Sequence, residues 1–255
     1  MQNNRKQMVT DLLKSIETGA AAPIAYIHPQ HYIQHNPAVA TGLDGFRELL
    51  QQLEPGSARV NTVRVLQDDD YVIAHSDYQF FGPKVGFDIF RFDGDTICEH
   101  WDNLQARPAL HNPSGHSMTD GSADITDLDQ TAANKELVGN FVHTILVQGK
   151  MEELGHYFDG DYYIQHNPGI GDGVSGLGQA LADWAQHGVT MQYQRVHKIL
   201  GEGNFVLAVS EGYMDKIHCA FYDLFRIQNG RIAEHWDTIE YIPPVAERRN
   251  SHGKF

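Results

Sequence analysis

An internal repeat constrains the fold more than any other feature of the sequence. The segment 87–102, FDIFRFDGDTICEHWD, returns 135 positions later as 222–237, YDLFRIQNGRIAEHWD. Each copy has two alternating runs of β-branched and aromatic residues around a turn that contains Gly94 or Gly230. This pattern is typical of a β-hairpin. Because a solenoid needs more copies of a much shorter unit, the repeat predicts two homologous domains.

The repeat also includes segments that precede the hairpins. The hexapeptide YIQHNP occurs at 32–37 and again at 163–168. The segment between the copies is rich in proline, serine, glycine and aspartate, which predicts an irregular linker. We therefore predict a first domain at 1–105, a linker at 106–129, a second domain at 130–245 and a surface tail at 246–255.

Within each copy, helices precede strands. Apolar residues at helical spacing predict a helix around 8–16, and a second-copy equivalent with Asn134 as N-cap and Gly149 as stop. Further helices are predicted at 43–53 and 177–187, and strands at 59–66, 71–81, 191–200 and 205–211, besides the hairpins. This order favours the α+β class with a mostly antiparallel sheet.

The hexapeptide ends in a proline, which disfavours helix at the residue before it. We therefore expect a short turn that ends at Asn36 and at its second-copy equivalent. Residues three apart share one side of a helical turn. On this interpretation Tyr32 and His35 lie together at the rim or floor of a pocket.

The composition argues against several kinds of partner. The 255 residues include 33 acidic residues against 19 Lys and Arg, for a formal net charge of −14 at pH 7. This charge disfavours nucleic acid and anionic membrane surfaces. No apolar run approaches the roughly 20 residues of a membrane-spanning helix, and no secretory signal is visible. Cys98 and Cys219 show no metal-binding spacing, so a cytoplasmic location is expected.

Polar residues within the hairpins predict the wall of a pocket. Successive side chains of a strand point to opposite faces. One face of the outgoing strand carries Asp88, Phe90 and Phe92. On the return strand, one face carries Cys98, His100 and Asp102. The opposite face carries Glu99 and Trp101, for which packing or an interface is expected.

Each copy resembles the SnoaL-like domains of the NTF2-like superfamily, through the order helix, YIQHNP, helix, strands and the closing Glu-His-Trp-Asp. The resemblance covers nearly the whole chain, twice over. It implies two tandem cone-shaped α+β barrels, in which a curved antiparallel sheet wraps N-terminal helices around a deep pocket. Such domains commonly pair through the outer face of the sheet, so we expect the two domains of this chain to pair with each other.

The resemblance also implies chemistry. Related proteins include polyketide cyclases, ketosteroid isomerase, scytalone dehydratase and limonene epoxide hydrolase, and others that only bind proteins or small molecules. The aspartate that ends the cyclase motif corresponds to Asp102 and Asp237, which would be the general acid/base. The cyclases carry a histidine where this chain has Asp88 and Asp223, so the chain departs from the cyclase pattern.

The expected activity is therefore cofactor-free acid/base chemistry on a small apolar carbonyl compound, by isomerisation, aldol-type cyclisation or dehydration. Burial beside aromatic rings should raise the pKa of the aspartates toward the range that suits proton transfer. The alternative is a non-catalytic small-molecule-binding or dimerisation module. In that case the aspartates hold backbone amides or imidazoles, and the histidines are satisfied by carboxylates.

The candidate site residues come from both copies. The catalytic candidates are Asp102, Asp237, His100 and His235. The substrate-binding candidates are Tyr32, His35, Asn36, Asp88 and Phe90, and in the second copy Tyr163, His166, Asn167, Asp223 and Phe225. Imidazoles and carboxylates also suit zinc or ferrous iron, but no spacing such as His-x-x-x-His enforces a site. We predict no metal, no cofactor, and a small molecule as partner.

The two pockets should differ in chemistry. His75 lies 135 positions before Ser210, which suggests that a serine replaces a histidine. Gly82 and Pro83 stand where the second copy has Ile217 and His218.

Overall fold

The chain divides into two compact units, and the division does not follow the linear order of the domains. The computed structural model describes residues 5–54 and 56–255. The first unit comprises Met1–Arg107 together with Ile242–Phe255, and the second comprises Pro108–Tyr241. The segment after the last strand thus belongs to the first unit, and the predicted linker belongs to the second except for Ala106 and Arg107.

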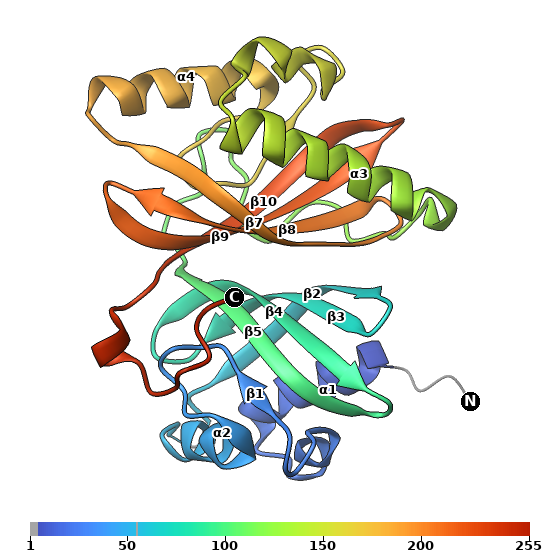
Figure 1. Ribbon diagram of the computed structural model, residues 1–255, viewed down its shortest axis with the longest axis vertical. Coiled ribbons are helices and arrows are strands. Elements are labelled where there is room, and N and C mark those ends of the chain that lie inside the picture. Colours follow the sequence, from blue (N-terminus) through green and yellow to red (C-terminus); the bar gives the residue numbers. More distant parts are fainter. Residues whose placement is uncertain (1–4, 55) are drawn as a thin grey trace. The chain divides into compact units, whose positions relative to one another are not determined.

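In the first unit, helices lie on one face of a mixed sheet (Figure 1). The sheet order is β1-β5-β4-β3-β2, with β1 parallel to β5 and the other neighbours antiparallel. The helical elements are α1 (Arg5–Thr18), η1 (Ala22–Tyr26), α2 (Gly42–Gln51) and η5 (Val245–Glu247). The strands are β1 (Ile33–Gln34), β2 (Arg59–Asp68), β3 (Tyr71–Gln79), β4 (Pro83–Asp93) and β5 (Thr96–Ala106).

The second unit repeats this architecture, with sheet order β6-β10-β9-β8-β7. Its helical elements are η2 (Leu128–Gln130), α3 (Thr131–Phe141), the π-helical turn η3 (Val142–Val147), η4 (Met151–His156) and α4 (Gly173–Gln186). Its strands are β6 (Ile164–Gln165), β7 (Met191–Glu202), β8 (Phe205–Met214), β9 (Ile217–Gln228) and β10 (Arg231–Tyr241). The predicted α+β class with two tandem domains is confirmed.

Each core lies between the first helix of the unit and the inner face of the sheet. Helix α1 buries Val9, Leu12 and Leu13 in a cluster with sheet residues such as Phe92. Full burial of one such side chain contributes roughly 1.5–3 kcal/mol. The predicted N-cap Asn134 is wrong, because α3 already begins at Thr131. The Asn134 side chain is buried and its Nδ2 donates to the carbonyl of Gly203 at 2.8 Å.

The hexapeptide contains a short parallel strand, Ile33–Gln34, where a helical turn was expected. Ile33 pairs with Glu99 and Gln34 with His100 in β1 and β5. Alternation along this strand directs Tyr32 and Gln34 to the same face and His35 to the other. The expected neighbourhood of Tyr32 and His35 on one side of a turn is therefore wrong, since the backbone of the segment hydrogen-bonds to β5.

The hairpins form as predicted, with one irregularity in each. The second turn has Asn229 at φ 51° and Gly230 at φ 69°, as a type I′ turn requires. In the first hairpin the register shifts between Arg91 and Phe92, so that Ile97 lies opposite Phe92 in the core. Cys98 falls in the bulge, and the prediction that it shares the face of His100 is wrong.

Strand pairing also corrects the alignment of the copies. His75 lies opposite Phe87, whereas Ser210 lies opposite Phe221. Since Ala74 and Ala208 both pair with the pocket aspartates, the residue that corresponds to His75 is Val209. A serine does not replace the histidine, because β3 and β8 are offset by one position less than the hairpins.

No helix among the described residues is both long and apolar enough to cross a membrane.

Candidate functional site

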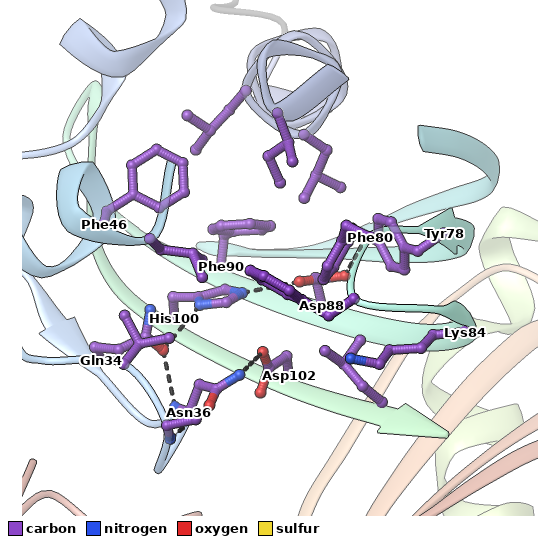
Figure 2. A pocket seen from close by; sticks show the side chains of 18 of the residues that line it. Gln34, Asn36, Phe46, Tyr78, Phe80, Lys84, Asp88, Phe90, His100 and Asp102 are labelled. Atoms are coloured by element: carbon purple, nitrogen blue, oxygen red, sulfur yellow. Dashed lines mark hydrogen bonds and ion pairs between the residues drawn. The ribbon is translucent and has the colours of Figure 1, made fainter. Parts of the chain in front are cut away.

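A cavity of about 320 Å³ opens in the first unit between the helices and the inner face of the sheet (Figure 2). Its size is at the lower end of small-molecule pockets. The apolar lining includes Leu12, Leu13, Phe46, Phe80 and Phe90. The polar wall includes Tyr32, Gln34, Asn36, Asp88, His100 and Asp102.

Asp88 and His100 form a linked pair across the hairpin. His100 Nε2 lies 3.0 Å from Asp88 Oδ1, and His100 Nδ1 lies 3.0 Å from Gln34 Oε1. Gln34 Oε1 also accepts the backbone N–H of Asn36 at 2.8 Å, so it is an acceptor and His100 Nδ1 must donate to it. The contact between His100 Nε2 and Asp88 therefore holds one further proton, carried by the imidazole or by the carboxyl group.

Asp102 is held from two sides. Asn36 Nδ2 donates to Asp102 Oδ2 at 2.6 Å, and Lys254 Nζ lies 3.5 Å from Asp102 Oδ1. Lys254 arrives on the C-terminal segment, where Asn250 Nδ2 donates to the carbonyls of Asn36 and Val39 at 2.7 and 2.9 Å. The prediction of a surface tail is therefore wrong for Lys254, which is only 3% exposed.

The second unit contains the same polar network around a much smaller cavity. His235 Nδ1 lies 2.9 Å from Gln165 Oε1, and His235 Nε2 lies 3.1 Å from Asp223 Oδ1. Asn167 Nδ2 donates to Asp237 Oδ2 at 2.6 Å. The cavity that these groups share with Tyr163 and Phe225 measures about 60 Å³. The network is thus duplicated, but the space for a ligand is not.

The tyrosine that donates to the pocket aspartate lies on a different strand in each unit. In the first unit Tyr78 on β3 donates to Asp88 Oδ2. In the second, Tyr193 on β7 donates to Asp223 at 3.2 Å, and the strand position that corresponds to Tyr78 is Gly212. Burial raises the pKa of both tyrosines well above the ordinary value, so both hydroxyls remain donors. The ring of Tyr193 lines the smaller cavity.

Asp237 lacks the lysine that faces its counterpart. Its Oδ1 has no hydrogen-bond partner among the described residues. Burial raises the pKa of Asp237 to about 6, opposed by His235 and reinforced by Asp223. The predicted rise of an aspartate pKa by desolvation is therefore present at this position.

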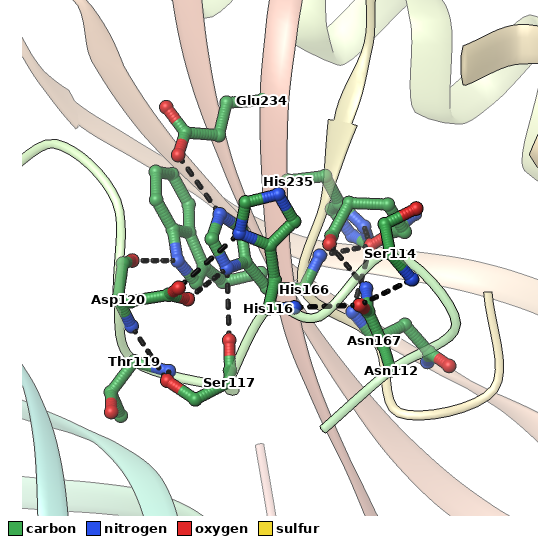
Figure 3. Close-up of polar contacts among 12 residues, drawn as sticks. Asn112, Ser114, His116, Ser117, Thr119, Asp120, His166, Asn167, Glu234 and His235 are labelled. Atoms are coloured by element: carbon green, nitrogen blue, oxygen red, sulfur yellow. Dashed lines mark hydrogen bonds and ion pairs between the residues drawn. The ribbon is translucent and has the colours of Figure 1, made fainter. Parts of the chain in front are cut away.

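His35 and His166 lie on the other side of the sheet from the cavities. The His35 ring stacks on Trp101 with centroids 4.7 Å apart, and its Nε2 lies 2.8 Å from Glu99 Oε1. His166 makes the same contacts with the tryptophan and the glutamate of its own unit, at 4.6 and 2.9 Å (Figure 3). The placement of these histidines at a pocket rim is thus corrected, because the YIQHNP segment alternates as a strand.

The remaining candidates do line the cavities, and further residues that the sequence interpretation missed join them. Phe90 and Phe225 stack on His100 and His235, with centroids 4.5 and 4.8 Å apart. The missed lining residues are Gln34, Tyr78, Gln165 and Tyr193, and Lys254 was missed as the partner of Asp102. Repetition of the hexapeptide, taken with a strand period, would have found the glutamines, but no local pattern marks the tyrosines or the lysine.

Comparison with solved structures gives several matches to single domains. TsrD from Streptomyces laurentii is 18% identical with a TM-score of 0.35, and the match covers 41% of this chain and 90% of TsrD. IdmH from Streptomyces antibioticus is 13% identical with a TM-score of 0.35, covering 40% and 93%. An NTF2-like protein from Cytophaga hutchinsonii is 15% identical with a TM-score of 0.33, covering 39% and 98%.

A search of curated proteins found no match. The family profile described as the SnoaL-like domain matches residues 138–235. This segment runs from within α3 into β10, so the second unit carries a SnoaL-like domain.

Proposed function

We propose that the first unit binds a small, largely apolar carbonyl compound and moves a proton on it without a cofactor. Asp102 is the acid/base group, and the pair of His100 and Asp88 polarises the carbonyl oxygen. The observation that carries the proposal is that these three side chains share one wall of a 320 Å³ cavity with an otherwise largely apolar lining. Isomerisation, aldol-type cyclisation and dehydration all begin with such a step.

The hydrogen-bond pattern supports a division of roles. Asn36 and Lys254 fix the orientation of the Asp102 carboxylate, which takes the proton α to the carbonyl. When substrate binds, the proton held between His100 and Asp88 is shared with the oxygen on which negative charge develops, while Tyr78 continues to donate to Asp88. An aspartate base combined with a protonated donor in an apolar pocket is an effective arrangement for enolisation.

The cavity volumes favour the first unit over the second. At about 60 Å³ the second cavity is far smaller than the roughly 300 Å³ at which small-molecule pockets begin. We therefore assign substrate binding to the first unit, and we assign the duplicated network of the second unit a structural role.

The test uses 2-tetralone, a bicyclic apolar ketone, as the probe. Wild-type protein should accelerate hydrogen–deuterium exchange at its α carbons in D₂O, followed by NMR. Asp102→Asn should lower the accelerated exchange rate about 100-fold or more. Saturation-transfer NMR should still detect tetralone binding to this variant. Asp237→Asn is the matched control and should exchange tetralone at the wild-type rate.

A second control addresses the location of the site. Ala38 is exposed at the edge of the cavity, so Ala38→Trp should obstruct entry without disturbing the core. It should abolish both binding and exchange. Equal exchange rates for wild type and Asp102→Asn would exclude the proposed role of Asp102.

One observation favours non-catalytic binding as the second candidate. The polar groups of the pocket already satisfy one another, through Tyr78 and His100 on Asp88 and through Asn36 on Asp102. A binding protein would show tetralone association that Ala38→Trp abolishes, with no acceleration of exchange in any variant.

A further inference from the structure

Two histidines and an aspartate of the second unit converge away from its cavity (Figure 3). His116 and Asp120 belong to the irregular segment that follows β5, and His166 follows β6. One ligand atom from each lies within 4.8 Å of the others. His166 Nδ1 is 2.7 Å from Asp120 Oδ1, and His116 Nδ1 is 3.2 Å from Asp120 Oδ2.

Acceptors surround both imidazole rings. Besides Asp120, His166 Nδ1 faces the Ser117 carbonyl at 2.9 Å, and His166 Nε2 faces Glu234 Oε1 at 2.9 Å. His116 Nε2 faces Asp172 Oδ2 at 3.3 Å. A neutral imidazole carries one N–H and one acceptor nitrogen. Each ring therefore needs a proton in both of its contacts, carried by the imidazole or by the facing carboxyl group, or a cation must take the place of one of these protons.

A single cation resolves this conflict better than two protons. The two ring centroids are 5.0 Å apart, and the His166 side chain is fully buried, so two imidazolium charges would repel each other at short range. A divalent ion bound by both Nδ1 atoms and by Asp120 replaces both protons. Each Nε2–H then donates to a carboxylate, as the second nitrogen of a metal-bound histidine usually does.

The surrounding charge favours a cation. Asp120, Asp172 and Glu234 contribute three carboxylates, and Arg226 Nε offsets one of them at 2.6 Å from Glu234 Oε2. The cluster therefore presents more negative than positive charge to the space between the two imidazoles.

We propose that the second unit binds one divalent transition-metal ion of the zinc class at His116, Asp120 and His166. Two imidazoles and one carboxylate suit zinc, whereas calcium and magnesium prefer oxygen ligands throughout. The His116 and Asp120 side chains are 30% and 45% exposed, which leaves a side of the site open to water as a further ligand. Glu234 and Asp172 orient the two imidazoles.

The test uses the full chain, freed of metal with a chelator and titrated with ZnCl₂ by calorimetry. We expect one ion per chain, and a tetrahedral or five-coordinate visible spectrum when Co²⁺ replaces Zn²⁺. His116→Ala and Asp120→Ala should each weaken zinc binding at least 100-fold and remove the cobalt spectrum. Asp172→Asn should weaken binding about 10-fold, as loss of an orienting carboxylate does.

The matched control is in the first unit. The His252 ring lies 6.2 Å from that of His35, whose Nδ1 faces the backbone carbonyl of Gly253 at 3.0 Å and no carboxylate. His252→Ala should bind zinc as wild type does. Circular dichroism of the metal-free variants checks that each is folded. Zinc affinity unchanged by His116→Ala and Asp120→Ala, or weak binding at many histidines only, would overturn the proposal.

Discussion

The ammonium nitrogen of Lys254 lies 3.5 Å from Oδ1 of Asp102, and both side chains are almost fully buried. The Oδ1 atoms of Asp102 and of Asp237, which occupies the same place in the second unit, both lack a hydrogen-bond partner among the described residues, but only Asp102 has a lysine beside it. The two aspartates thus occupy equivalent strand positions, and each accepts a hydrogen bond from an equivalent asparagine. The positive charge of a lysine favours the ionised form of Asp102 only. Their substitutions should have opposite effects on stability.

Removal of the lysine charge should destabilise the protein. A buried pair is costly to break from one side because the remaining charge is left in a medium of low polarity. Lys254→Met preserves the volume of the side chain and should lower the free energy of unfolding at pH 7 by about 3 kcal/mol, measured by urea denaturation. In Lys254→Met/Asp102→Asn much of this loss should return. Additive effects of the two substitutions would contradict the coupling.

Neutralisation of Asp237 should stabilise the protein at neutral pH. Its folded-state pKa of about 6 exceeds the ordinary value of 3.8, so the folded state binds the proton more tightly than the unfolded state does. Stability contributed by this group is therefore full only below the ordinary pKa of 3.8 and is lost as pH rises through about 6. Asp237→Asn should exceed wild type in unfolding free energy by up to about 3 kcal/mol at pH 8, and the difference should vanish as the pH falls below the ordinary pKa of 3.8.

The two tyrosine hydroxyls should contribute similarly despite their different strands. Tyr78→Phe and Tyr193→Phe each remove the donor to a buried pocket aspartate. Loss of a hydrogen bond to a buried charged group costs about 1–3 kcal/mol, which thermal or urea unfolding measures. Tyr213→Phe, in which the changed residue is half-buried beside His218, serves as the control and should unfold like wild type. A loss for only one of the two pocket tyrosines would refute their equivalence.

The segment that carries His116 depends on a glycine for its position. Gly121 has φ +87°, and a Cβ there would lie 2.1 Å from Glu234 Oε1. Gly121→Ala should therefore displace the segment and expose it to limited proteolysis. Gly115→Ala is the matched control, because Gly115 has φ +88° but no atom within 4 Å of the added carbon. Equal proteolysis of the two variants would mean that backbone strain, and not the close approach, sets the effect.

Sequence patterns correctly predicted those features of the fold and the site that depend on local periodicity. The alternation around Asp88, His100 and Asp102 indicated a polar wall, and the structure brings these side chains to one cavity. Two-residue strands such as β1 have too little sequence for a period to appear, so His35 was placed on the wrong face. The His116-x₃-Asp120 spacing was visible, but nothing in it indicated that His166 would lie beside it.

Long-range effects account for the other differences. Lys254 is buried because Asn250 anchors the tail to the carbonyls of Asn36 and Val39, a contact between the two ends of the sequence that no pattern reveals. Tyr78 and Tyr193 come from different strands, although each donates to the equivalent aspartate of its unit. Composition and spacing are blind to such a choice.

The interleaved path of the chain limits how the protein can be divided. A fragment that stops at Arg107 lacks the residues that carry Asn250 and Lys254, and a fragment that starts after the irregular segment lacks His116 and Asp120. Each fragment would thus lack a segment that packs against its own unit in the intact chain. Fragments cut within the predicted linker should therefore be less stable than the intact chain. A circularly permuted chain that keeps each unit together with its full set of segments should retain the native contacts.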